Sequence, residues 1–266
     1  MKKIISLALV MALMLTALLV FTSCGNNGAV VIGYTIYDPK NYKDENGELV
    51  GFDTELAKAV FEKLGYTATF KEIEWDQKYT ELNSGTIDCI WNGFTANTAD
   101  DDGIARSEKV DFSYNYMRNK QVIVTTKDLV STVVDASSLA GTVGAVETGS
   151  AGDSFLTKEL TGAVKKGVKS QLDAMRELSL GTADFVVVDE QLAKAYVGVG
   201  DYADLAIVET VTGTEEFYAI GIKKGSDFTA KVNKALEELA ADGTIAALAE
   251  KYGVSNTAIV DFSDQK

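Results

Sequence analysis

Two carboxylates end the stretch DFVVVDE (184–190) and could take part in chemistry. The four apolar residues before them, three of which are β-branched, are typical of a strand that is buried on both faces. Ligands of open α/β sheets bind beyond the carboxyl ends of the strands, and Asp189 stands at such an end. We therefore expect its carboxylate to face a ligand cleft. The alternative role of Asp189 is an N-cap for the segment after residue 190, although Glu190 is the better candidate for that cap.

This strand belongs to the second of two similar segments. ELNSGTIDCIWNG (81–93) and ELSLGTADFVVVD (177–189) have Glu, Leu, Gly, Thr and Asp at five of their first eight positions. In each segment a helix ends at a glycine, and an apolar strand follows after a short turn. Asn92 and Gly93 therefore occupy the strand end that Asp189 occupies in the second copy. Two such units far apart in the chain predict two lobes with a cleft between them.

The boundaries of the elements can also be predicted. The first of these helices is expected to begin at an N-capping Asp76 and to end at Gly85, and the second to begin at Ser170 and to end at Gly181. We predict further strands at 29–36, 67–75 and 141–146, and helices at 54–65, 149–160 and 227–253, the last broken near Gly243. This alternation predicts an α/β fold with mostly parallel sheets.

The composition excludes several classes of function. The 266 residues, 46% apolar and 24% charged, are typical of a globular chain with two compact units. The chain has no histidine, which excludes Ser-His-Asp and Cys-His catalysis and most zinc sites. The formal net charge is −14 and falls to −16 without the two lysines of residues 1–23. Such an excess of acid argues against nucleic acid or an anionic surface as a partner.

The first residues predict export. A basic tip (MKK), an apolar run (IISLALVMALMLTALLVF) and small residues before Cys24 are typical of a signal segment. We expect cleavage after residue 23 and lipidation of Cys24; the alternative is an uncleaved anchor, since about 18 apolar residues can just span a bilayer. Both interpretations place the domain outside the cytoplasm. With Cys24 lipidated, Cys89 has no disulfide partner, and we expect it to be a small buried hydrophobe.

Several longer stretches occur in the order expected of one family. These are GELVGFDTELAKAVFEKLG, NSGTIDCIWNGFT, KVDFSYNYMRNKQVIV, ETGSAG, GTADFVVVDE and NKALEELAADGTIAALAEKYG. Together they resemble the polar amino-acid-binding lipoproteins of ABC importers (family 3 extracellular solute-binding proteins), over nearly all of the mature chain. The resemblance implies a two-lobed, type II periplasmic-binding-protein-like fold, in which each lobe is a mostly parallel sheet flanked by helices.

The same resemblance implies a division of the chain. Residues 1–23 would be the signal peptide, 24–119 the first part of lobe 1, 120–219 lobe 2, and 220–266 the C-terminal part of lobe 1. Two strands would cross between the lobes, and we expect them at 120–126 and 216–224. With only one proline and few visible linkers, these strands must form the hinge.

In this family a free amino acid is bound between the lobes, and the resemblance assigns partners to its charged groups. Arg106 stands before VDFS (110–113) as the family's arginine does, and it would bind the ligand carboxylate. Backbone N–H groups at a helix start would add to it, namely those of Gly149, Ser150 and Ala151. Asp189 would bind the ammonium group together with the carbonyl of Gly93 and the hydroxyl of Thr95. The pocket of the ligand side chain would be lined by Tyr37, Asn92, Phe94 and Glu147, whereas Trp75 and Trp91 are expected in the core.

The chain departs from the family pattern in two places. The acidic stretch NTADDDG (97–103) behaves as an insertion, because Thr95 stands eleven residues before Arg106 where about five are expected. Arg106 could therefore be a surface arginine that balances the three aspartates at 100–102. Lys40 stands where relatives often have an aromatic residue, a change that could alter the pocket mouth.

Two other motifs do not meet their requirements. A calcium loop is excluded, because Thr98 and Lys109 stand where it needs acidic residues. A phosphate-binding loop is also excluded: the segment contains glycines at 141, 144, 149 and 152, but the lysine and the hydroxyl residue that complete such a loop are absent. No cofactor and no metal are expected.

The predicted function is capture of a free, polar L-amino acid and its delivery to an ABC importer, without catalysis. The expected partners are the amino acid, the importer's membrane permease and, through the lipid anchor, the outer side of the cytoplasmic membrane; the protein is expected to be a monomer. A lipid-anchored, dehydratase-like enzyme on the same fold is the alternative. A sensor domain is a third class, for which the chain to Lys266 shows no signalling segment.

Overall fold

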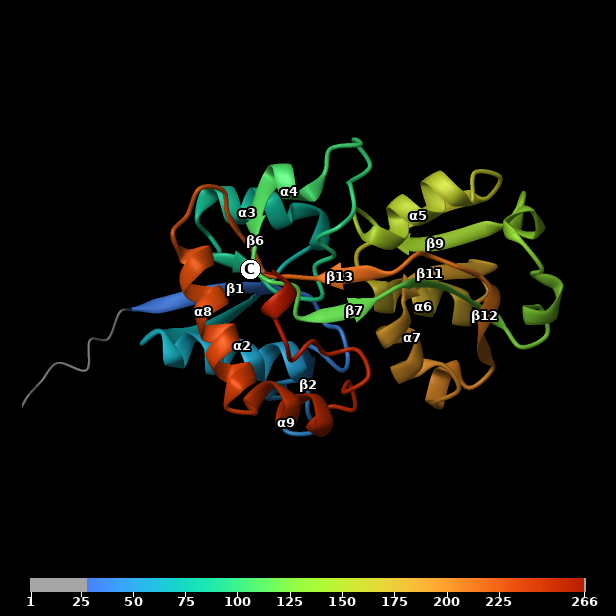
Figure 1. Ribbon diagram of the computed structural model, residues 1–266. Coiled ribbons are helices and arrows are strands. Elements are labelled where there is room, and N and C mark those ends of the chain that lie inside the picture. The colour runs from blue at the N-terminus through green and yellow to red at the C-terminus, as the bar shows by residue number, and fades with distance from the viewer. Residues whose placement is uncertain (1–27, 266) are drawn as a thin grey trace, which may run out of the picture.

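The computed structural model describes residues 28–265, which form two lobes joined side by side (Figure 1). The predicted signal segment and Cys24 lie outside the described residues. Within them, no helix combines the length and the apolar character that crossing a membrane requires.

Lobe 1 is built on a five-stranded sheet. In spatial order its strands are β4 (Thr67–Glu72), β1 (Ala29–Tyr34), β5 (Cys89–Ile90), β14 (Gly221–Lys223) and β6 (Val110–Phe112). β1 pairs in parallel with β4 and β5, and β14 runs antiparallel to both of its neighbours. One face is covered by α2 (Phe52–Lys63), α8 (Phe228–Ala241) and α9 (Thr244–Lys251), and the other by α3 (Lys78–Ser84) and α4 (Arg106–Lys109) (Figure 1).

Lobe 2 repeats this design. Its sheet has the order β10 (Val164–Val168), β9 (Val143–Glu147), β11 (Phe185–Asp189), β8 (Gln121–Thr126) and β12 (Leu205–Thr212). β9 pairs in parallel with β10 and β11, and β8 is the antiparallel strand. Helix α5 (Ala151–Glu159) covers one face, and α6 (Gln171–Ser179) and α7 (Glu190–Tyr196) cover the other (Figure 1).

The internal repeat predicted from the sequence is thus real at the level of topology. The succession β1-α2-β4-α3-β5 in lobe 1 corresponds to β9-α5-β10-α6-β11 in lobe 2. Ser170 caps α6 as predicted, with its Oγ accepting a hydrogen bond from the backbone N–H of Asp173 at 3.0 Å. The predicted cap Asp76 is wrong: it lies within a 3₁₀ turn (Trp75–Gln77), and this turn moves the start of α3 to Lys78.

Two short strands cross between the lobes. β7 (Met117–Asn119) and β13 (Glu216–Tyr218) pair in antiparallel orientation and lie at the junction (Figure 1). The crossing segments are shorter than the predicted 120–126 and 216–224. Residues 121–126 belong to the sheet of lobe 2 and residues 221–223 to that of lobe 1, because their apolar side chains are buried there.

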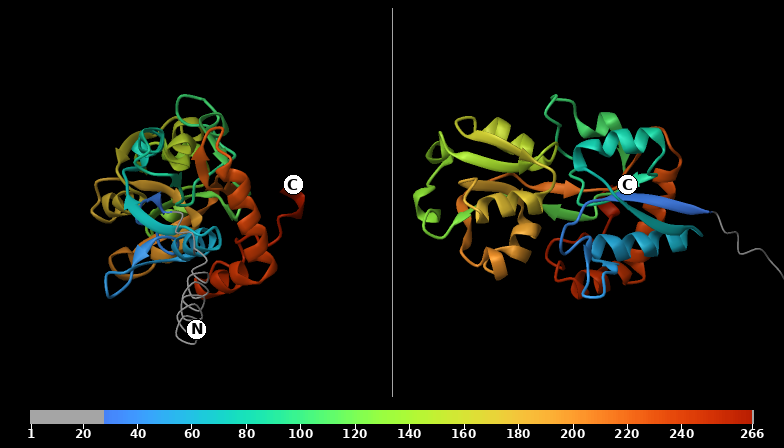
Figure 2. Two further views of the ribbon diagram at one scale, coloured as in Figure 1. Left: turned by 90° about the vertical axis from the view of Figure 1, so that its left-hand side faces the viewer. Right: turned by 180° about the vertical axis from the view of Figure 1, so that it is seen from behind.

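The remaining elements are small. A hairpin pairs β2 (Tyr42–Lys43) with β3 (Leu49–Val50), and further 3₁₀ helices lie at Val130–Thr132, Ala136–Leu139, Gly200–Tyr202 and Ser263–Gln265. β1 starts at the end of lobe 1 that points away from lobe 2, and the C-terminal residues return to lobe 1 (Figure 2). Cys89 is completely buried in β5, as expected, and is a free thiol within residues 28–265.

Candidate functional site

A cavity lies between the lobes, at the carboxyl ends of parallel strands of both sheets. It is lined by Trp75, Asn92, Gly93, Thr95 and Arg106 of lobe 1 and by Glu147, Ser150, Ala151, Gln171 and Asp189 of lobe 2. Eight of these ten residues were predicted from the sequence. The cavity volume is about 10 Å³, which is room for roughly one water molecule. An amino acid can therefore enter only when the lobes move apart.

Asp189 ends β11 and is only 5% exposed. Three side-chain amides donate to its carboxylate: those of Asn119 (2.8 Å), Gln121 (2.6 Å) and Gln171 (2.6 Å). Its side chain makes no helix-capping bond, although α7 starts at the next residue. Within residues 28–265 it has no ion-pair partner at 4.0 Å or less, so a buried anion faces the cavity. Glu190 is not a cap either, since it is the first residue of α7 and pairs with Lys120 and Lys194.

A second carboxylate, which the sequence reasoning missed, shares the amides of Asp189. Asn119 and Gln121 also donate to Oε2 of Glu216, at 3.0 and 2.9 Å, and the hydroxyl of Thr95 approaches the same atom at 3.4 Å. Burial and the nearby charge of Asp189 raise the pKa of Glu216 to about 7. The only sequence signal was an acidic residue at the start of a predicted crossing strand.

Arg106 is 1% exposed, so it is not a surface arginine. Its Nε donates to Oδ1 of Asp100 at 2.8 Å, one terminal nitrogen to the carbonyl of Thr95 at 3.2 Å, and the other to the carbonyl of Gly149 at 3.3 Å. A guanidinium has five N–H groups. Two therefore remain, one on each terminal nitrogen, and these can form a fork with a carboxylate.

The start of α5 faces Arg106 from lobe 2. Ser150 caps this helix through its Oγ, which accepts from the backbone N–H of Asp153 at 3.0 Å. Ser150 and Ala151 line the cavity, whereas Gly149 does not. Two of the three predicted N–H donors are already bonded: that of Gly149 donates to the carboxylate of Asp153 at 3.0 Å, and that of Ser150 to the carbonyl of Glu147 at 3.1 Å. The Gly149 carbonyl instead receives Lys78 (3.0 Å) as well as Arg106, so two cations of lobe 1 reach lobe 2 at this point.

Glu147 ends β9 and is 3% exposed. Its Oε1 has no hydrogen-bond partner among residues 28–265. Burial and the charge of Asp189 raise its pKa to about 8, against the opposite influence of Lys78 and Arg106. Lys78 is also buried, and burial together with Arg106 lowers its pKa to about 7. The cavity is therefore lined by carboxylates that lack a full complement of cations.

Two predicted residues lie behind the cavity wall. Phe94 is fully buried beneath Arg106, with the guanidinium carbon 5.3 Å from its ring centroid, and packs edge-on against Trp75. The hydroxyl of Tyr37 contacts that of Tyr218 at 3.1 Å. Burial and the charge of Asp189 raise the pKa of Tyr37 well above its usual value. Trp75 lies in a hydrophobic core cluster with Leu82 and Phe94, as expected, but it also lines the cavity. Trp75 follows the carboxyl end of β4, and Asn92 follows the carboxyl end of β5 in the same sheet. This shared position was the sequence signal that could have placed Trp75 at the cavity.

Two polar residues of lobe 1 support this wall. Asn92 lines the cavity, but its amide is already bonded to Thr35 and Asn41. Lys40 does not lie at a pocket mouth: it is fully buried, with Nζ 4.6 Å from the ring centroid of Tyr37 and 4.9 Å from that of Tyr218. Gly93 has a φ of 60°, in the left-handed region that favours glycine, and a Cβ there would lie 3.1 Å from the Lys40 side chain, which would have to shift.

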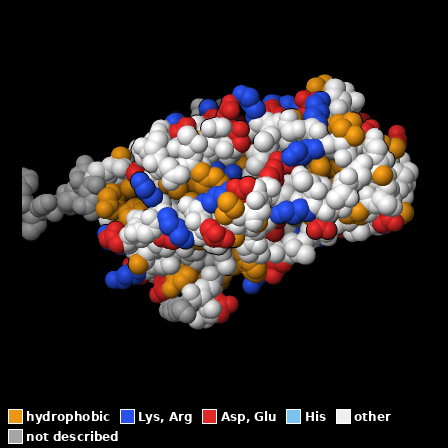
Figure 3. Space-filling view, turned by 90° about the horizontal axis from the view of Figure 1, so that it is seen from above, with side chains coloured by type: hydrophobic (Ala, Val, Ile, Leu, Met, Phe, Trp, Pro, Cys, Tyr) orange, Lys and Arg blue, Asp and Glu red, His pale blue; other side chains and the backbone are white. Residues whose placement is uncertain are grey.

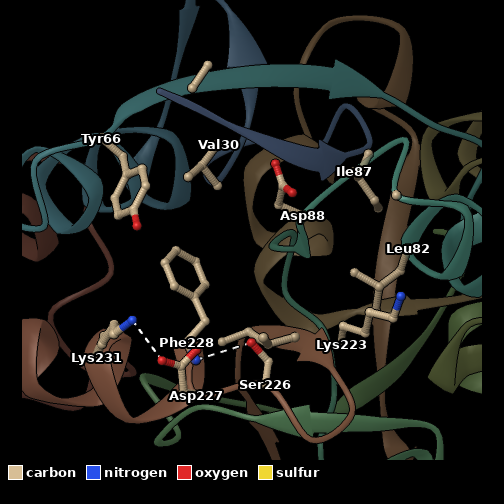
Figure 4. A pocket seen from close by; sticks show the side chains of 13 residues that line it. Val30, Tyr66, Leu82, Ile87, Asp88, Lys223, Ser226, Asp227, Phe228 and Lys231 are labelled. Carbon is tan, nitrogen blue, oxygen red and sulfur yellow. Dashed lines mark hydrogen bonds and ion pairs between the residues drawn. The ribbon is translucent and has the colours of Figure 1, made fainter. Parts of the chain in front are cut away.

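A larger hollow of about 450 Å³ lies in lobe 1, near the amino ends of β1 and β5 (Figure 4). Tyr66, Val30 and Phe228 form much of its wall, and three of its four charged side chains, those of Asp88, Asp227 and Lys231, are already engaged. Asp88 accepts from the backbone of Val31, and Asp227 pairs with Lys231 at 2.9 Å. This hollow lacks the converging, unpaired charges that a zwitterion requires.

Comparisons with known proteins agree with this fold. Residues 30–255 match the family described as bacterial extracellular solute-binding proteins, family 3. The arginine-binding extracellular protein ArtP of Bacillus subtilis (strain 168) is 30% identical over 245 residues, which are 87% of this chain and 91% of ArtP. An ancestral arginine-binding protein with bound arginine superimposes with a TM-score of 0.77 at 35% identity, over 85% of this chain and 98% of the other. The ancestral amino-acid-binding protein AncCDT-1, a precursor of cyclohexadienyl dehydratase, superimposes with a TM-score of 0.75 at 29% identity, over 85% and 96%.

Proposed function

Since the chain belongs to the bacterial extracellular solute-binding proteins of family 3, we propose that the amino acid it captures has a cationic side chain. The chain is a polar amino-acid-binding protein of an ABC transporter that works outside the cytoplasm. The proposal concerns the ligand's side chain, the residues that bind it and the anchor.

The charge balance of the cavity carries this proposal. Glu147 is mostly protonated at neutral pH. Once it is ionised, three buried carboxylates, those of Asp189, Glu147 and Glu216, lie near two cations, Arg106 and Lys78, while the buried Lys40 behind the cavity wall is balanced by Asp53. A zwitterion adds one positive and one negative charge and leaves that imbalance unchanged. A ligand with a second positive charge would neutralise it, and the unpartnered oxygen of Glu147 is the group that would receive it. Arginine, the ligand named for ArtP and for the ancestral protein, has this property.

We assign the remaining contacts as follows. The two N–H groups left on Arg106 and the start of α5 bind the ligand carboxylate, while Asp189, the carbonyl of Gly93 and the hydroxyl of Thr95 bind its ammonium group. Trp75 packs against the ligand side chain. The lobes, divided at 119/120 and 219/220, close around the ligand by bending at β7 and β13. The bonds from Lys78 and Arg106 to Gly149 link the lobes in the closed arrangement.

Glu147→Gln is expected to weaken arginine binding by about tenfold or more, because a charge-assisted hydrogen bond is lost. Binding of glutamine should change by less than about threefold. Calorimetric titration of both ligands checks this, with the exposed Glu209→Gln as matched control. Equal weakening of arginine and glutamine would contradict a role of Glu147 in side-chain recognition.

The pH dependence provides a second readout of the same variant. With a pKa of about 8, Glu147 is mostly protonated at neutral pH and must lose its proton when a cation binds. Arginine affinity should therefore rise between pH 6 and pH 8, by up to about tenfold per pH unit. Lys78 and Glu216 titrate in the same range and also contribute to the pH dependence of arginine affinity. The contribution of Glu147 is the part of this pH dependence that disappears in Glu147→Gln.

A dehydratase-like activity is the second candidate, and Glu147 is the observation that favours it. A carboxyl group that is protonated at neutral pH in a closed cavity can act as a general acid. Incubation with cyclic carboxylic acids, followed by chromatography, separates the two functions: turnover that is lost in Glu147→Gln would establish the enzyme.

We further propose that Cys24 carries a lipid and holds the protein on the outer side of the cytoplasmic membrane, where the monomer meets the importer's permease. A Cys24→Ser protein should appear in the soluble fraction or remain unprocessed, because it lacks the lipid that anchors it. Membrane fractionation and the mass of the product check this. Membrane-bound Cys24→Ser protein of mature size would contradict the lipid anchor.

A further inference from the structure

The acidic insertion forms a small hairpin beside Arg106. Ala99 and Ala105 form an antiparallel bridge, and the backbone N–H of Asp100 donates to the carbonyl of Ile104 at 3.1 Å. The turn closes at Gly103, whose φ of 78° lies in the left-handed region that favours glycine. This geometry brings Asp100 back onto the guanidinium of Arg106.

Asp100 is held in place by three donors. Its Oδ1 accepts from Nε of Arg106 at 2.8 Å, and its Oδ2 accepts from Lys109 at 2.8 Å and from the hydroxyl of Tyr79 at 2.7 Å. The residue is 8% exposed. Burial by itself would raise the pKa of Asp100, but Arg106, Lys109 and Tyr79 outweigh it and lower the pKa to about 2. Asp100 is therefore ionised at any pH at which the protein works.

These contacts restrict how the guanidinium can lie. The ring of Phe94, whose centroid is 5.3 Å from the guanidinium carbon, limits the movement of the guanidinium on one side, and Asp100 restricts its rotation by holding Nε. The carbonyls of Thr95 and Gly149 take one N–H from each terminal nitrogen. Lys109 supplies a second cation, so that Asp100 does not cancel the charge of Arg106.

We propose that Asp100 is a positioning residue for ligand recognition: it orients Arg106 so that one N–H of each terminal nitrogen meets the ligand carboxylate. This inference rests on the proposed assignment of Arg106 to the carboxylate, and it gives the acidic insertion a role in binding. The hairpin also touches lobe 2, because Ser154 of α5 donates to the carbonyl of Ala99 at 3.0 Å and to Asp101 at 3.2 Å. Charged side chains of both signs gather on this face of the molecule (Figure 3).

The test compares single substitutions in the full chain, since deletion of the hairpin would also remove the contacts to Ser154. Asp100→Ala should weaken arginine binding about 10- to 100-fold in calorimetric titration. Asp100→Asn, which keeps the shape and one acceptor, should lose less and serves if the alanine variant does not fold. Asp102→Asn is the matched control, because Asp102 lies in the same hairpin and pairs with Lys109 but does not contact Arg106. The Asp102→Asn protein should bind arginine as tightly as the unchanged protein.

A double-mutant cycle separates positioning from a merely structural role. In an Arg106→Ala background, Asp100→Ala should cause less than a twofold further loss, because the group it orients is gone. Agmatine, which is arginine without its carboxylate, should bind equally well to the unchanged and Asp100→Ala proteins. A full loss that persists in the Arg106→Ala background, or equal weakening of arginine and agmatine, would overturn the proposal. If the unchanged protein does not bind arginine, the cationic ligand is refuted, and the same cycle with the amino acid that does bind and its decarboxylated amine still decides the role of Asp100.

Discussion

An Asp189→Ala protein is expected to bind every amino acid at least about 30-fold more weakly than the unchanged protein. Removal of one partner of a desolvated charge pair costs about 2–5 kcal/mol, because the ligand's ammonium group would stay buried without its counter-charge. Asp189 is 5% exposed and is surrounded by amides, which cannot replace its negative charge. Calorimetric titration over a panel of amino acids measures the loss, and Asp189→Asn, which keeps the shape, should show most of it.

The neighbouring Glu216 makes this prediction specific. It shares the amides of Asn119 and Gln121 with Asp189 and could in principle take its place. Glu216→Gln should therefore weaken binding less than Asp189→Ala, and the exposed Asp201→Ala should not change it. An Asp189→Ala protein that keeps its affinity while Glu216→Gln loses it would move the ammonium site from Asp189 to Glu216.

Arg106→Ala is expected to weaken all amino acids by a similar factor, about 30-fold or more, because the ligand carboxylate would lose its fork of two hydrogen bonds. Arg106→Lys should recover only part of the affinity, since an ammonium group cannot form that fork. Asp100 keeps Lys109 and Tyr79 as partners in both variants, so the fold should persist, and thermal unfolding checks this.

A matched arginine variant completes this experiment. Arg176 is exposed and pairs with Asp173 on the surface of α6, so Arg176→Ala should bind like the unchanged protein. The loss in Arg106→Ala should be large for amino acids and small for amines without a carboxylate. Equal losses for both kinds of ligand would mean that Arg106 supports the cavity and does not bind the carboxylate.

Much of the fold could be predicted because its signals are local. Apolar runs such as FVVV before Asp189 are buried strands, and the helix predicted at 54–65 is present as α2, with Leu56, Val60 and Phe61 fully buried. The glycines that end α3 and α6 adopt the expected left-handed backbone. The crossing strands were predicted too long, because an apolar strand inside a sheet and one that runs between lobes have the same sequence pattern.

The sequence by itself indicated the alternation of strands and helices and the strand ends that face the cleft, with Asn92 and Asp189 at two of them; the resemblance to the family added Arg106 and Glu147. Only the tertiary structure decided which side chains meet there. Glu216 reaches the amide of Asn119 from 97 positions away, and Lys78 reaches Gly149 from 71. The apolar pattern of a segment shows which of its positions face the interior. It does not show which distant segment supplies the hydrogen-bond partners, because these depend on how both lobes pack. For that reason the acidic insertion, which in the sequence cast doubt on Arg106, proved in the structure to supply its partner Asp100.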